Sequence, residues 1–456
     1  MIKLPRDTEL TLPLLQRLLD EHTHEVNNRY KALKDALESD HEIKHLPKKP
    51  AYKPDNRIVC NFARYIVETF NGFFIGNPVK VVAEDSAVAD YVEFLDAYND
   101  QDDNNAELAR LMSTFGKAYE MYFTDEESEQ CITYLSPMEA FMVKDDSVLE
   151  RPLFFVRRYT DWEGNEYGSV FDSKWERRFK HTGGLQWIDE DWAEHRYDGV
   201  PATEYIENAE EQGIFEPVLS NINAYNKAIS EKANDVDYFA DAYMKVLGVA
   251  LDEEGIQHIR DNRIINFEGD DAGKIVVEFM GKPESDTAQE NLLNRLERLI
   301  FQNSMVANIS DENFGTSSGI ALKYKLLAMN NLVKTKIRKF TSGMNRRYKL
   351  LFGHPASKVP KDAWMQLEYQ FTPNLPANLL EEAQIAAQME GITSHHTQLK
   401  ILSAVDDVEE ELERIEEENE PDEETVVDRM MFPPQTEQPE ADSEEEEPEE
   451  GVMDDQ

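Results

Sequence analysis

The strongest constraint on the fold is a long amphipathic pattern in the second half of the chain. Apolar residues recur there at steps of three or four, which is the spacing of one face of an α-helix. The stripe consists of Leu322, Leu326, Met329, Val333, Ile337, Phe340, Met344, Tyr348 and Leu351. It predicts a helix of roughly 33 residues, about 50 Å long. We expect Gly343 to permit a kink, and Gly353 and Pro355 to end the helix.

Two further helical patterns precede this one, and a short β-like insert separates them. The first, in residues 221 to 250, predicts a helix about 40 Å long. Its stripe is Ile222, Tyr225, Ile229, Ala233, Val236, Phe239, Tyr243 and Val246. Residues 251 to 283 contain the strand-like runs "RIINFE" and "KIVVEFM". The second helix is expected from Asp286 to Ser304, with Leu292, Leu296 and Leu299 on its face.

The first half of the chain mixes helices with short strands. An amphipathic helix is expected over residues 11 to 38, with Thr11 as its N-cap and Pro13 in its first turn. Further helices are expected after residue 55 and over residues 104 to 116, followed by the strands "AYEMYFTD" and "CITYLSP". Alternating runs between Phe154 and Tyr205 predict a β-meander. The fold class we predict is therefore α+β.

A polar loop with two glycines connects the last two long helices. A phosphate-binding loop needs a Lys after its second glycine to reach the terminal phosphates, but here Ile320 follows Gly319. The loop is better explained as a helix connection, with a tight turn at Gly315 and Ser317 or Ser318 as the cap of the long helix. We therefore do not predict a nucleotide site.

The charge of the chain limits its contacts with nucleic acid. It carries 92 acidic and 47 basic residues, a net charge of -45, whereas a tight grip on phosphates needs clustered Lys and Arg. Residues 401 to 456 alone hold 25 acidic and 2 basic residues. Their Pro- and Glu-rich composition predicts a disordered tail from about residue 419.

No cofactor, metal or catalytic site is predicted. Cys60 and Cys131 are too few for a disulfide framework or a cysteine-rich zinc site. His395 and His396 are adjacent, a poor arrangement for chelation on one helix face. Acidic pairs, such as those at 102–103 and 270–271, are expected by chance in so acidic a chain. The start lacks the features of a signal peptide, and no run of about 18 apolar residues occurs, so we expect a soluble protein outside the membrane.

Four blocks of the sequence carry a resemblance to a known family. They are "KPDNRIVCNFARYIVETFNGFFIGNPV", "GKAYEMYFTDEESEQCITYLSPMEAFMV", "INAYNKAISEKANDVDYFADAY" and "ISDENFGTSSGIALKYKLLAMNN". In this order and spacing, they resemble the portal proteins of tailed bacteriophages, in the siphophage branch. The resemblance covers roughly residues 52 to 418. It adds to the residue patterns a specific architecture and a specific function.

The resemblance implies a portal fold with an α/β wing, long stem helices, a small β-containing clip, a helical crown and the disordered acidic tail. The implied parts are a wing in 1–220, a first stem helix in 221–250, a clip in 251–283, a second stem helix in 284–305, a tunnel loop in 306–318, a long wing helix in 319–353, a crown in 354–418 and the tail in 419–456. A ring of usually twelve subunits would sit at a capsid vertex. DNA would pass through it during packaging and ejection.

The resemblance also implies partners and a channel lining. The partners are the terminase large subunit, the major capsid or scaffold protein, a head-completion or adaptor protein, and double-stranded DNA passing non-specifically. The protein would be part of the virion, after assembly in the host cytoplasm. The tunnel-loop residues that would face DNA are Asn308, Asp311, Glu312, Asn313, Thr316, Ser317 and Ser318. An ordinary solvated helix connection is the alternative explanation of this loop.

One basic cluster lies on the long helix. Its members are Lys334, Lys336, Arg338, Lys339, Arg346, Arg347 and Lys349. DNA binding, contact with an acidic flank of the next subunit, and a solvated helix face are three explanations, and in so acidic a chain we favour the last two. Our candidate inter-subunit patch consists of Arg338, Lys339, Arg346 and Arg347.

Alternative functions remain open at this point. The first is another phage head or head-completion protein that interacts with the particle without encircling DNA. An enzyme, such as a metal nuclease that uses one of the acidic pairs, is a more distant alternative. The acidic tail is a solvated segment that repels packaged DNA, a docking segment for a scaffold or minor head protein, or simply disordered.

Overall fold

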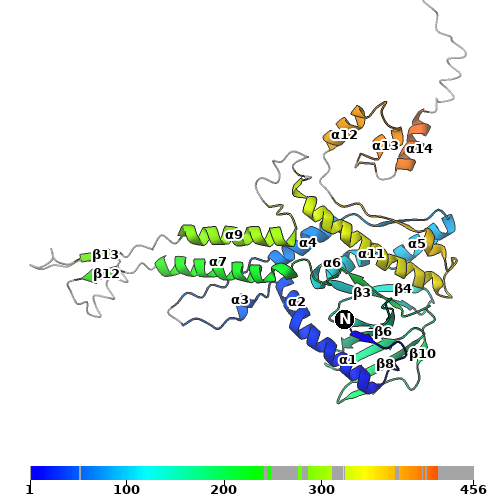
Figure 1. Cartoon of the computed structure of the whole chain (residues 1–456), viewed down its shortest axis with the longest axis horizontal. Coiled ribbons are helices and arrows are strands. Elements are labelled where there is room, and N and C mark those ends of the chain that lie inside the picture. The colour runs from blue at the N-terminus through cyan, green and yellow to red at the C-terminus, as the bar shows by residue number, and fades with distance from the viewer. Residues whose placement is uncertain are drawn as a thin grey trace, which may run out of the picture. The chain divides into compact units, whose positions relative to one another are not determined.

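The computed structural model describes residues 2–50, 53–240, 244–247, 276–279, 286–310, 322, 324–374, 379–402, 404–405 and 408–419. The chain divides into two compact units, Met1–Leu375 and Pro376–Gln456. Helices and largely antiparallel sheets make up the first unit, and helices make up the described part of the second (Figure 1). The predicted mixture of helix and sheet is confirmed.

The larger sheet of the first unit has seven strands. They are β1 (Ile2–Leu4), β5 (Ala140–Asp145), β6 (Pro152–Thr160), β7 (Glu166–Phe171), β8 (Trp175–His181), β9 (Leu185–Trp187) and β10 (Ala193–Glu194). Their order is β1-β5-β6-β7-β8-β10, and β9 pairs with β8. The consecutive antiparallel pairing of β5 to β8 confirms the predicted meander. The parallel pairing of β1 with β5 was not predicted.

The N-terminal helix covers one face of this sheet. It consists of α1 (Leu12–Glu25), a π-helical turn at Val26–Tyr30 and α2 (Lys31–Leu37), which confirms the predicted helix over residues 11 to 38. Thr11 accepts a hydrogen bond from the backbone N–H of Leu14, as expected of an N-cap. Leu15, Leu18 and Leu19 form a core with the inner residues of the sheet.

His22, on the face of α1 that packs on the sheet, is buried. Its ring stacks on Phe141 at 4.6 Å, and its Nε2 lies 2.8 Å from the carbonyl oxygen of Pro137. Because neutral Nε2–H can donate to that carbonyl, the neutral ring is well accommodated. Burial lowers the pKa of His22 to about 4.

The second sheet and the remaining helices of the first unit surround its main core. The sheet has the order β11 (Ala202–Ile206), β3 (Lys117–Thr124), β4 (Gln130–Leu135). The helices around this core are α4 (Phe62–Ile75), α5 (Ser86–Tyr98), α6 (Gln101–Phe115) and α11 (Leu327–Gly353). The aromatic run on α4 belongs to this core, because Phe70, Phe73 and Phe74 are all buried.

Shorter elements complete the first unit. They are α3 (Glu42–His45), β2 (Lys80–Val82), the 3-10 turns Glu216–Val218 and Ala363–Gln366, and β14 (Glu368–Gln370). Strand β14 pairs antiparallel with β2, so a segment beyond the long helix returns to pack with the first unit. The compact unit therefore extends to Leu375, beyond the boundary at residue 354 that the resemblance implied.

Helix α11 confirms the apolar stripe on which its prediction rested. Leu326, Met329, Val333, Phe340 and the later members of the stripe are buried. The helix continues through Gly343, so the expected kink is replaced by a packing role. A Cβ on Gly343 would lie 2.2 Å from the Tyr205 ring, and only glycine lets α11 approach β11 so closely.

Arg347 on α11 is fully buried in an ion pair with Glu120 of β3. Its Nε and Nη2 donate to the two carboxylate oxygens of Glu120 at 2.8 and 2.7 Å, and Nη2 also donates to Asn105 at 2.7 Å. The hydroxyls of Tyr122 and Tyr205 donate to the same carboxylate. This bidentate arrangement offsets the cost of removing both charges from water.

Lys336, three turns earlier, is a second buried cation. Its Nζ lies 2.8 Å from Glu207 Oε2 and donates to the Ala109 carbonyl and the Ser113 hydroxyl. It also lies 5.0 Å from the centre of the Phe74 ring. Desolvation lowers the pKa of Lys336 and raises the pKa of Glu207, because burial penalises both charged forms.

The second unit contains α12 (Leu379–Gln388), α13 (His395–Leu399) and α14 (Val408–Asn419). Gly391, with φ of 75°, and the N-cap Ser394 shape the turn between α12 and α13. The tail was predicted from residue 419, which is the last residue of α14, and its residues 420–456 lie outside the described residues. Within the described parts of both units, none of the helices combines the length and apolar character needed to span a membrane.

The Arg347–Glu120 pair predicts a strongly non-additive double-mutant cycle. Glu120→Leu alone leaves an unpaired buried guanidinium and should cost about 3–5 kcal/mol of unfolding free energy. Adding Arg347→Met should restore much of that loss, because no unpaired charge then remains buried at this position. Chemical denaturation measures both effects.

The exposed pair of Lys361 and Asp198 is the matched control. Lys361→Met should leave the denaturation midpoint almost unchanged, because solvent screens this pair. Additive losses at Glu120 and Arg347 would contradict the account.

The burial of His22 predicts an acid-sensitive stability. The unfolded ring binds a proton below about pH 6.5 but the folded ring only below about pH 4, so stability should fall as pH drops through this window. The loss should reach at most about 3 kcal/mol. His22→Gln should flatten this part of the profile in denaturation measured from pH 7 to pH 4, and an unchanged slope would contradict the assignment.

Candidate functional site

The candidate functional region is a pair of helices that projects from the α/β body. Helix α7 (Leu219–Ala240) leaves the body and α9 (Asp286–Ser304) returns to it, side by side (Figure 1). Between them, β12 (Met244–Leu247) and β13 (Val276–Phe279) pair antiparallel. We call α7 and α9 the stem pair.

The outer end of α7 corrects one prediction. The apolar stripe suggested a helix through Val246, but α7 ends at Ala240 and residues 244–247 form β12. Pairing with β13 overrides the local helical spacing, since the run "MKVL" also fits a strand. The predicted strand "KIVVEFM" is confirmed as β13, whereas "RIINFE" lies outside the described residues.

The exposed faces of the stem pair also differ from the predicted stripes. Val236 on α7 is 54% exposed and Leu292 on α9 is 51% exposed. Helix α9 instead buries Leu293 and Ile300, a row one residue further along the chain. Successive residues of a helix are rotated by about 100° around its axis. The face of α9 that carries Leu293 and Ile300 packs toward α7 and the body, and Leu292 therefore lies outside it.

Polar and ionic contacts join the two stem helices away from the body. Lys232 on α7 forms an ion pair with Glu290 on α9. One helical turn away, the side-chain amide of Gln289 donates to Asp235 at 2.7 Å. These contacts fix the register of the two helices beside each other.

Aromatic side chains fasten the stem pair at its base. Phe62, at the start of α4, makes edge contacts with Tyr225 of α7 at 4.9 Å and with Phe301 of α9 at 5.8 Å. Tyr65 contacts Phe301 as well, and its hydroxyl accepts a hydrogen bond from the backbone N–H of Ile309. One helix of the body therefore contacts both stem helices.

A ladder of hydrogen bonds joins α7 to the extended segment before α4. Asn234, Ser230 and Asn226 accept from the backbone N–H groups of Asn56, Ile58 and Cys60, at 2.6, 2.9 and 2.8 Å. All three side chains on α7 are buried. We call these three bonds the stem ladder.

The stem ladder can form because the spacing of side chains along one face of α7 matches the spacing of N–H groups along the extended segment. Four residues of an α-helix rise about 6.0 Å, and two residues of an extended chain rise about 6.6 Å. Side chains at i, i+4 and i+8 can therefore meet every second N–H of an extended segment that runs in the opposite direction. The Ser230 hydroxyl also donates to the Asn226 carbonyl, so its own donor is satisfied.

The predicted tunnel loop is only partly described. Asn308 donates to Glu297 of α9 at 3.2 Å and accepts from the backbone N–H of Ser310. Val306 is buried in the main core. These residues therefore pack against the stem and body. The other six predicted residues, Asp311, Glu312, Asn313, Thr316, Ser317 and Ser318, lie outside the described residues.

The structure separates the residues of the predicted inter-subunit patch. Arg347 is buried and paired with Glu120 of its own chain, so its predicted contact with another subunit is wrong. Half-buried Arg346 donates to the backbone carbonyls of Ala202 and Val200. Arg338 is exposed and Lys339 is half-buried, and their role stays a prediction. Of the wider cluster, Lys336 also proves to be a core residue.

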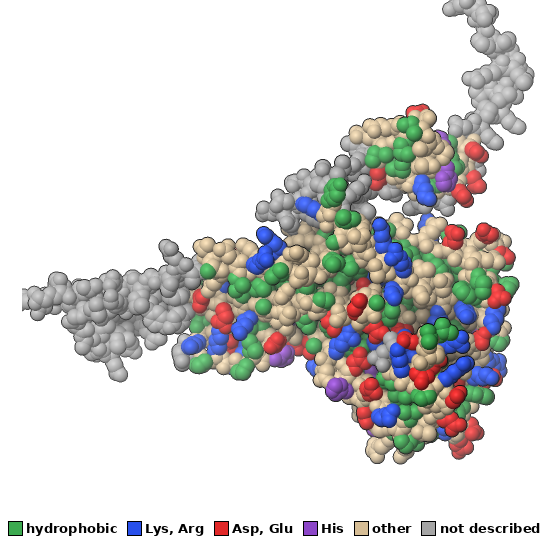
Figure 2. Space-filling model, viewed as in Figure 1, with side chains coloured by type: hydrophobic (Ala, Val, Ile, Leu, Met, Phe, Trp, Pro, Cys, Tyr) green, Lys and Arg blue, Asp and Glu red, His purple; other side chains and the backbone are tan. Residues whose placement is uncertain are grey.

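The remaining catalytic candidates are only partly described, because the acidic pair at 270–271 lies outside the described residues. In the ranges that the structure describes, no cluster of three or more His, Cys, Asp or Glu suits a metal ion. Asp102 and Asp103 lie in the first turn of α6, where negative charge favours a helix. On the face in Figure 2, Lys and Arg are scattered among acidic residues and form no continuous basic track.

The stem ladder was missed at the sequence level, although a signal was present. Asn226, Ser230 and Asn234 repeat at steps of four, beside the apolar stripe on α7. Asn and Ser are poor choices for a helix interior unless their side chains have a specific partner. The partner segment, residues 56–60, is more than 160 positions away, and no local pattern identifies it.

The stem ladder predicts a localised loss of protection. Ser230→Ala removes the acceptor of the Ile58 N–H, which should destabilise this contact by about 1–2 kcal/mol and make amide exchange in residues 56–60 about 5- to 30-fold faster. Hydrogen-exchange mass spectrometry measures this. Lys227→Ala, an exposed change on the same helix, should leave the exchange unchanged. Equal effects of both variants would contradict a specific role of the ladder.

Two comparisons of the sequence with known proteins agree. Residues 15–425 match the family model described as "Phage portal protein, SPP1 Gp6-like". A portal protein of Clostridium phage phiCD119 is 24% identical over 407 residues, which cover 82% of this chain and 88% of that protein. These matches extend over both helices of the stem pair.

Two solved structures are similar over most of the chain. One is a chain from the neck of an empty GTA particle computed with C6 symmetry, with 14% identity and a TM-score of 0.48 over 82% of this chain and 93% of that one. The other is from the neck of a native GTA particle computed with C12 symmetry, with 15% identity and a TM-score of 0.48 over 75% and 89%. Because the family match covers well over half of the sequence, the chain belongs to the SPP1 Gp6-like family of phage portal proteins.

Proposed function

We propose that the protein forms a closed ring at one vertex of the capsid, through which double-stranded DNA enters and leaves the particle. The stem pair is the observation that carries this proposal. Two antiparallel helices project from an α/β body and are fixed to it by the stem ladder and the aromatic contacts of Phe62. Repeated around an axis, such subunits would supply a wall of paired helices around a channel.

The parts of the chain receive roles within this proposal. The α/β body up to residue 218 serves as the wing, and the stem pair crosses the shell. The segment between Ala240 and Asp286, which includes β12 and β13, serves as the clip that meets the packaging motor. Helix α11 is the long wing helix, and the helices α12 to α14 serve as the crown.

The net charge of the chain supports a channel in which DNA slides rather than a site that binds DNA tightly. Each phosphate neutralised by Lys or Arg adds salt-dependent affinity, which would hold DNA in place. A chain with a net charge of -45 provides few such contacts. Seven tunnel-loop residues would line the channel with short polar side chains and let the duplex slide: Asn308, Asp311, Glu312, Asn313, Thr316, Ser317 and Ser318.

The proposed partners follow from this position at the vertex. The terminase large subunit would supply the energy for packaging, since the portal is proposed to have no chemistry of its own. The major capsid or scaffold protein would hold the ring in the shell, and a head-completion or adaptor protein would join it to the tail. The ring would be a component of the virion, after assembly in the host cytoplasm.

The proposal predicts a ring of defined mass. Purified full-length protein, at low micromolar concentration and moderate salt, should assemble to about twelve times the chain mass of 52.6 kDa. Negative-stain images should show a central hole wide enough for duplex DNA. A monomer or dimer at every salt concentration, even with the capsid and scaffold proteins present, would instead favour a head-completion protein that does not encircle DNA.

The same measurement tests the remaining part of the inter-subunit patch. We propose that Arg338 and Lys339 meet an acidic flank of the next subunit. Reversing both charges should shift rings toward free subunits at moderate salt. Reversal of Lys361, which pairs with Asp198 on the surface of its own chain, is the control and should leave ring formation intact. If the rings were equally stable in both variants, Arg338 and Lys339 would not contribute to the contact between subunits.

A further inference from the structure

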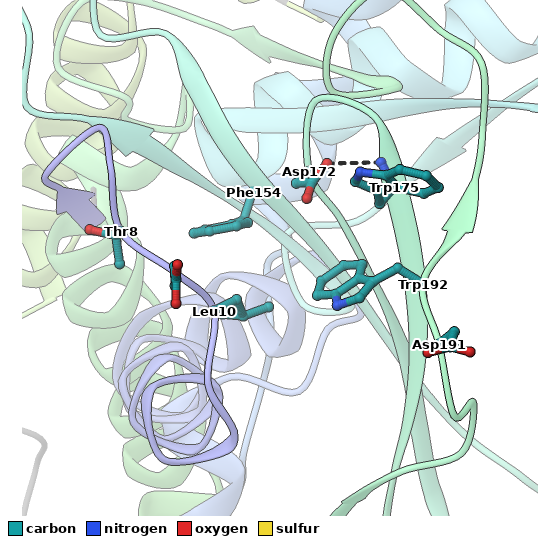
Figure 3. Close-up of a pocket in the computed structure, with 8 residues that line it drawn as sticks. Thr8, Leu10, Phe154, Asp172, Trp175, Asp191 and Trp192 are labelled. Atoms are coloured by element: carbon teal, nitrogen blue, oxygen red, sulfur yellow. Dashed lines mark hydrogen bonds between the residues drawn. The ribbon is translucent and has the colours of Figure 1, made fainter.

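A pocket on the large sheet is separate from the stem pair. It has a volume of about 600 Å³ and is lined by Thr8, Glu9, Leu10, Phe154, Asp172, Trp175, Asp191 and Trp192. These residues come from the segment before α1, strand β6, the turn between β7 and β8 together with the first residue of β8, and the segment between β9 and β10. Segments far apart in the sequence thus converge on one hollow (Figure 3).

The interior of the pocket is apolar and aromatic. Phe154 is buried and belongs to the core beneath α1, so it forms a fixed floor. Trp175, which is 41% exposed, and the half-buried Trp192 form walls, and Leu10 lies across from them (Figure 3). Exposed indoles of this kind bind flat apolar surfaces and cations.

Three carboxylates lie around this aromatic interior. Glu9 and Asp191 are exposed, and Asp172 is half-buried. None of the three has an ion-pair partner in the part of the chain that the structure describes. No Lys or Arg is among the lining residues, so the lining carries three carboxylates and no cation.

Asp172 is held in place by its turn. One of its oxygens, Oδ1, accepts from the backbone N–H groups of Lys174 and Trp175 at 2.7 and 2.8 Å. The same interaction fixes the start of the Trp175 side chain relative to the carboxylate (Figure 3). The second oxygen, Oδ2, has no hydrogen bond among the described residues and remains available to a ligand.

An arginine of the chain itself demonstrates how these indoles interact. The guanidinium of Arg177 lies 4.5 Å from the centre of the Trp187 ring and 6.0 Å from that of Trp192. Its donors are used by the carbonyls of Asp189 and Glu190. It forms no ion pair with the three carboxylates of the pocket, and it shows that a guanidinium is stable beside this tryptophan cluster.

We infer that this pocket binds an arginine side chain presented by a segment of another protein. The planar guanidinium would stack against Trp175 or Trp192 and donate to Asp172 Oδ2 and to Glu9 or Asp191. The aliphatic part of the arginine and its apolar neighbour would cover Phe154 and Leu10. The volume of the pocket exceeds that of one side chain, so it also admits the residues on either side of the arginine.

Arginine fits these groups better than other cations. Its fork of N–H donors matches a carboxylate in a bidentate manner, and its plane stacks on an indole, whereas the ammonium of lysine is a point charge that keeps its water more strongly. A free polyamine has the charge but lacks the plane. The inference rests on the pocket alone and holds whether or not the chain forms a DNA conduit.

The test uses full-length protein and fluorescence anisotropy of three labelled peptides. The peptides have the sequence Gly-Ser-X-Leu-Ser-Gly, where X is arginine, lysine or citrulline, the last a neutral isostere of arginine. The pocket variant is Glu9→Gln/Asp172→Asn/Asp191→Asn, in which the side-chain amide oxygen at position 172 can still accept the turn bonds. The control variant Glu126→Gln/Glu127→Gln/Glu163→Gln removes the same charge from exposed hairpins.

The arginine peptide should bind most tightly, the lysine peptide more weakly, and the citrulline peptide at least about tenfold more weakly than arginine. The pocket variant and Trp175→Leu should each weaken arginine binding about tenfold, and the control variant should change it less than about twofold. Two results would overturn the inference. One is an equal loss of binding in the pocket and control variants. The other is tight binding of spermidine without binding of any peptide, which would assign the pocket to a free polyamine.

Discussion

The orientation of α11 in the α/β body depends on two buried cations. Arg347 and Lys336 have been removed from water, and each is tolerated only where its carboxylate partner and its neutral acceptors are in place. Glu120 comes from β3 and Glu207 directly follows β11. A rotation or slide of α11 would separate both cations from these partners, so the pairs set its register against the second sheet. Gly343 then allows the close approach to Tyr205.

The position of the stem pair follows from this arrangement through α4. Phe74, near the end of α4, contacts Phe340 of α11 at 5.6 Å, and Lys336 lies beside the same ring. Phe62, at the start of α4, contacts both stem helices. The extended segment that leads into α4 supplies the N–H groups of the stem ladder. One helix therefore connects the interior of the body to the base of the stem.

The proposed role as a DNA conduit places physical demands on this mounting of the stem pair. A wall around a sliding polyanion needs rigid elements, because DNA under load pushes on them, and it needs few cations on its surface. Hydrogen bonds that are buried and paired supply rigidity without charge. The stem ladder uses two amides and a hydroxyl for this purpose, whereas the ionic contacts between α7 and α9 involve only Lys232 and Glu290 among the described charged pairs.

Much of the fold could be predicted from local patterns. The stripe of α11, the limits of α9, the helix over residues 11 to 38 and the meander all follow from periodicity and capping, which act within a few residues. Contacts between segments that are far apart in the sequence could not be predicted. Nothing local distinguishes Arg347, which is buried, from Arg338, which is exposed, because the difference depends on Glu120 more than 200 positions away.

The candidate site was predictable to a smaller extent. The two stem helices were expected, but the exposed side of α9, the end of α7 and the ladder all depend on tertiary partners. The predicted loop residues from Asp311 onward lie outside the described residues and remain predictions. The pocket beside Trp175 assembles from four segments, and no motif in the sequence marks it.

The most direct test of the central claim is a reconstruction of the assembled ring by cryo-electron microscopy. The account predicts that the stem pairs of all subunits surround the axis, with α7 and α9 lining a continuous channel and the seven-stranded sheets at the periphery. Stem pairs at the outer rim, or a ring without an axial opening, would contradict it.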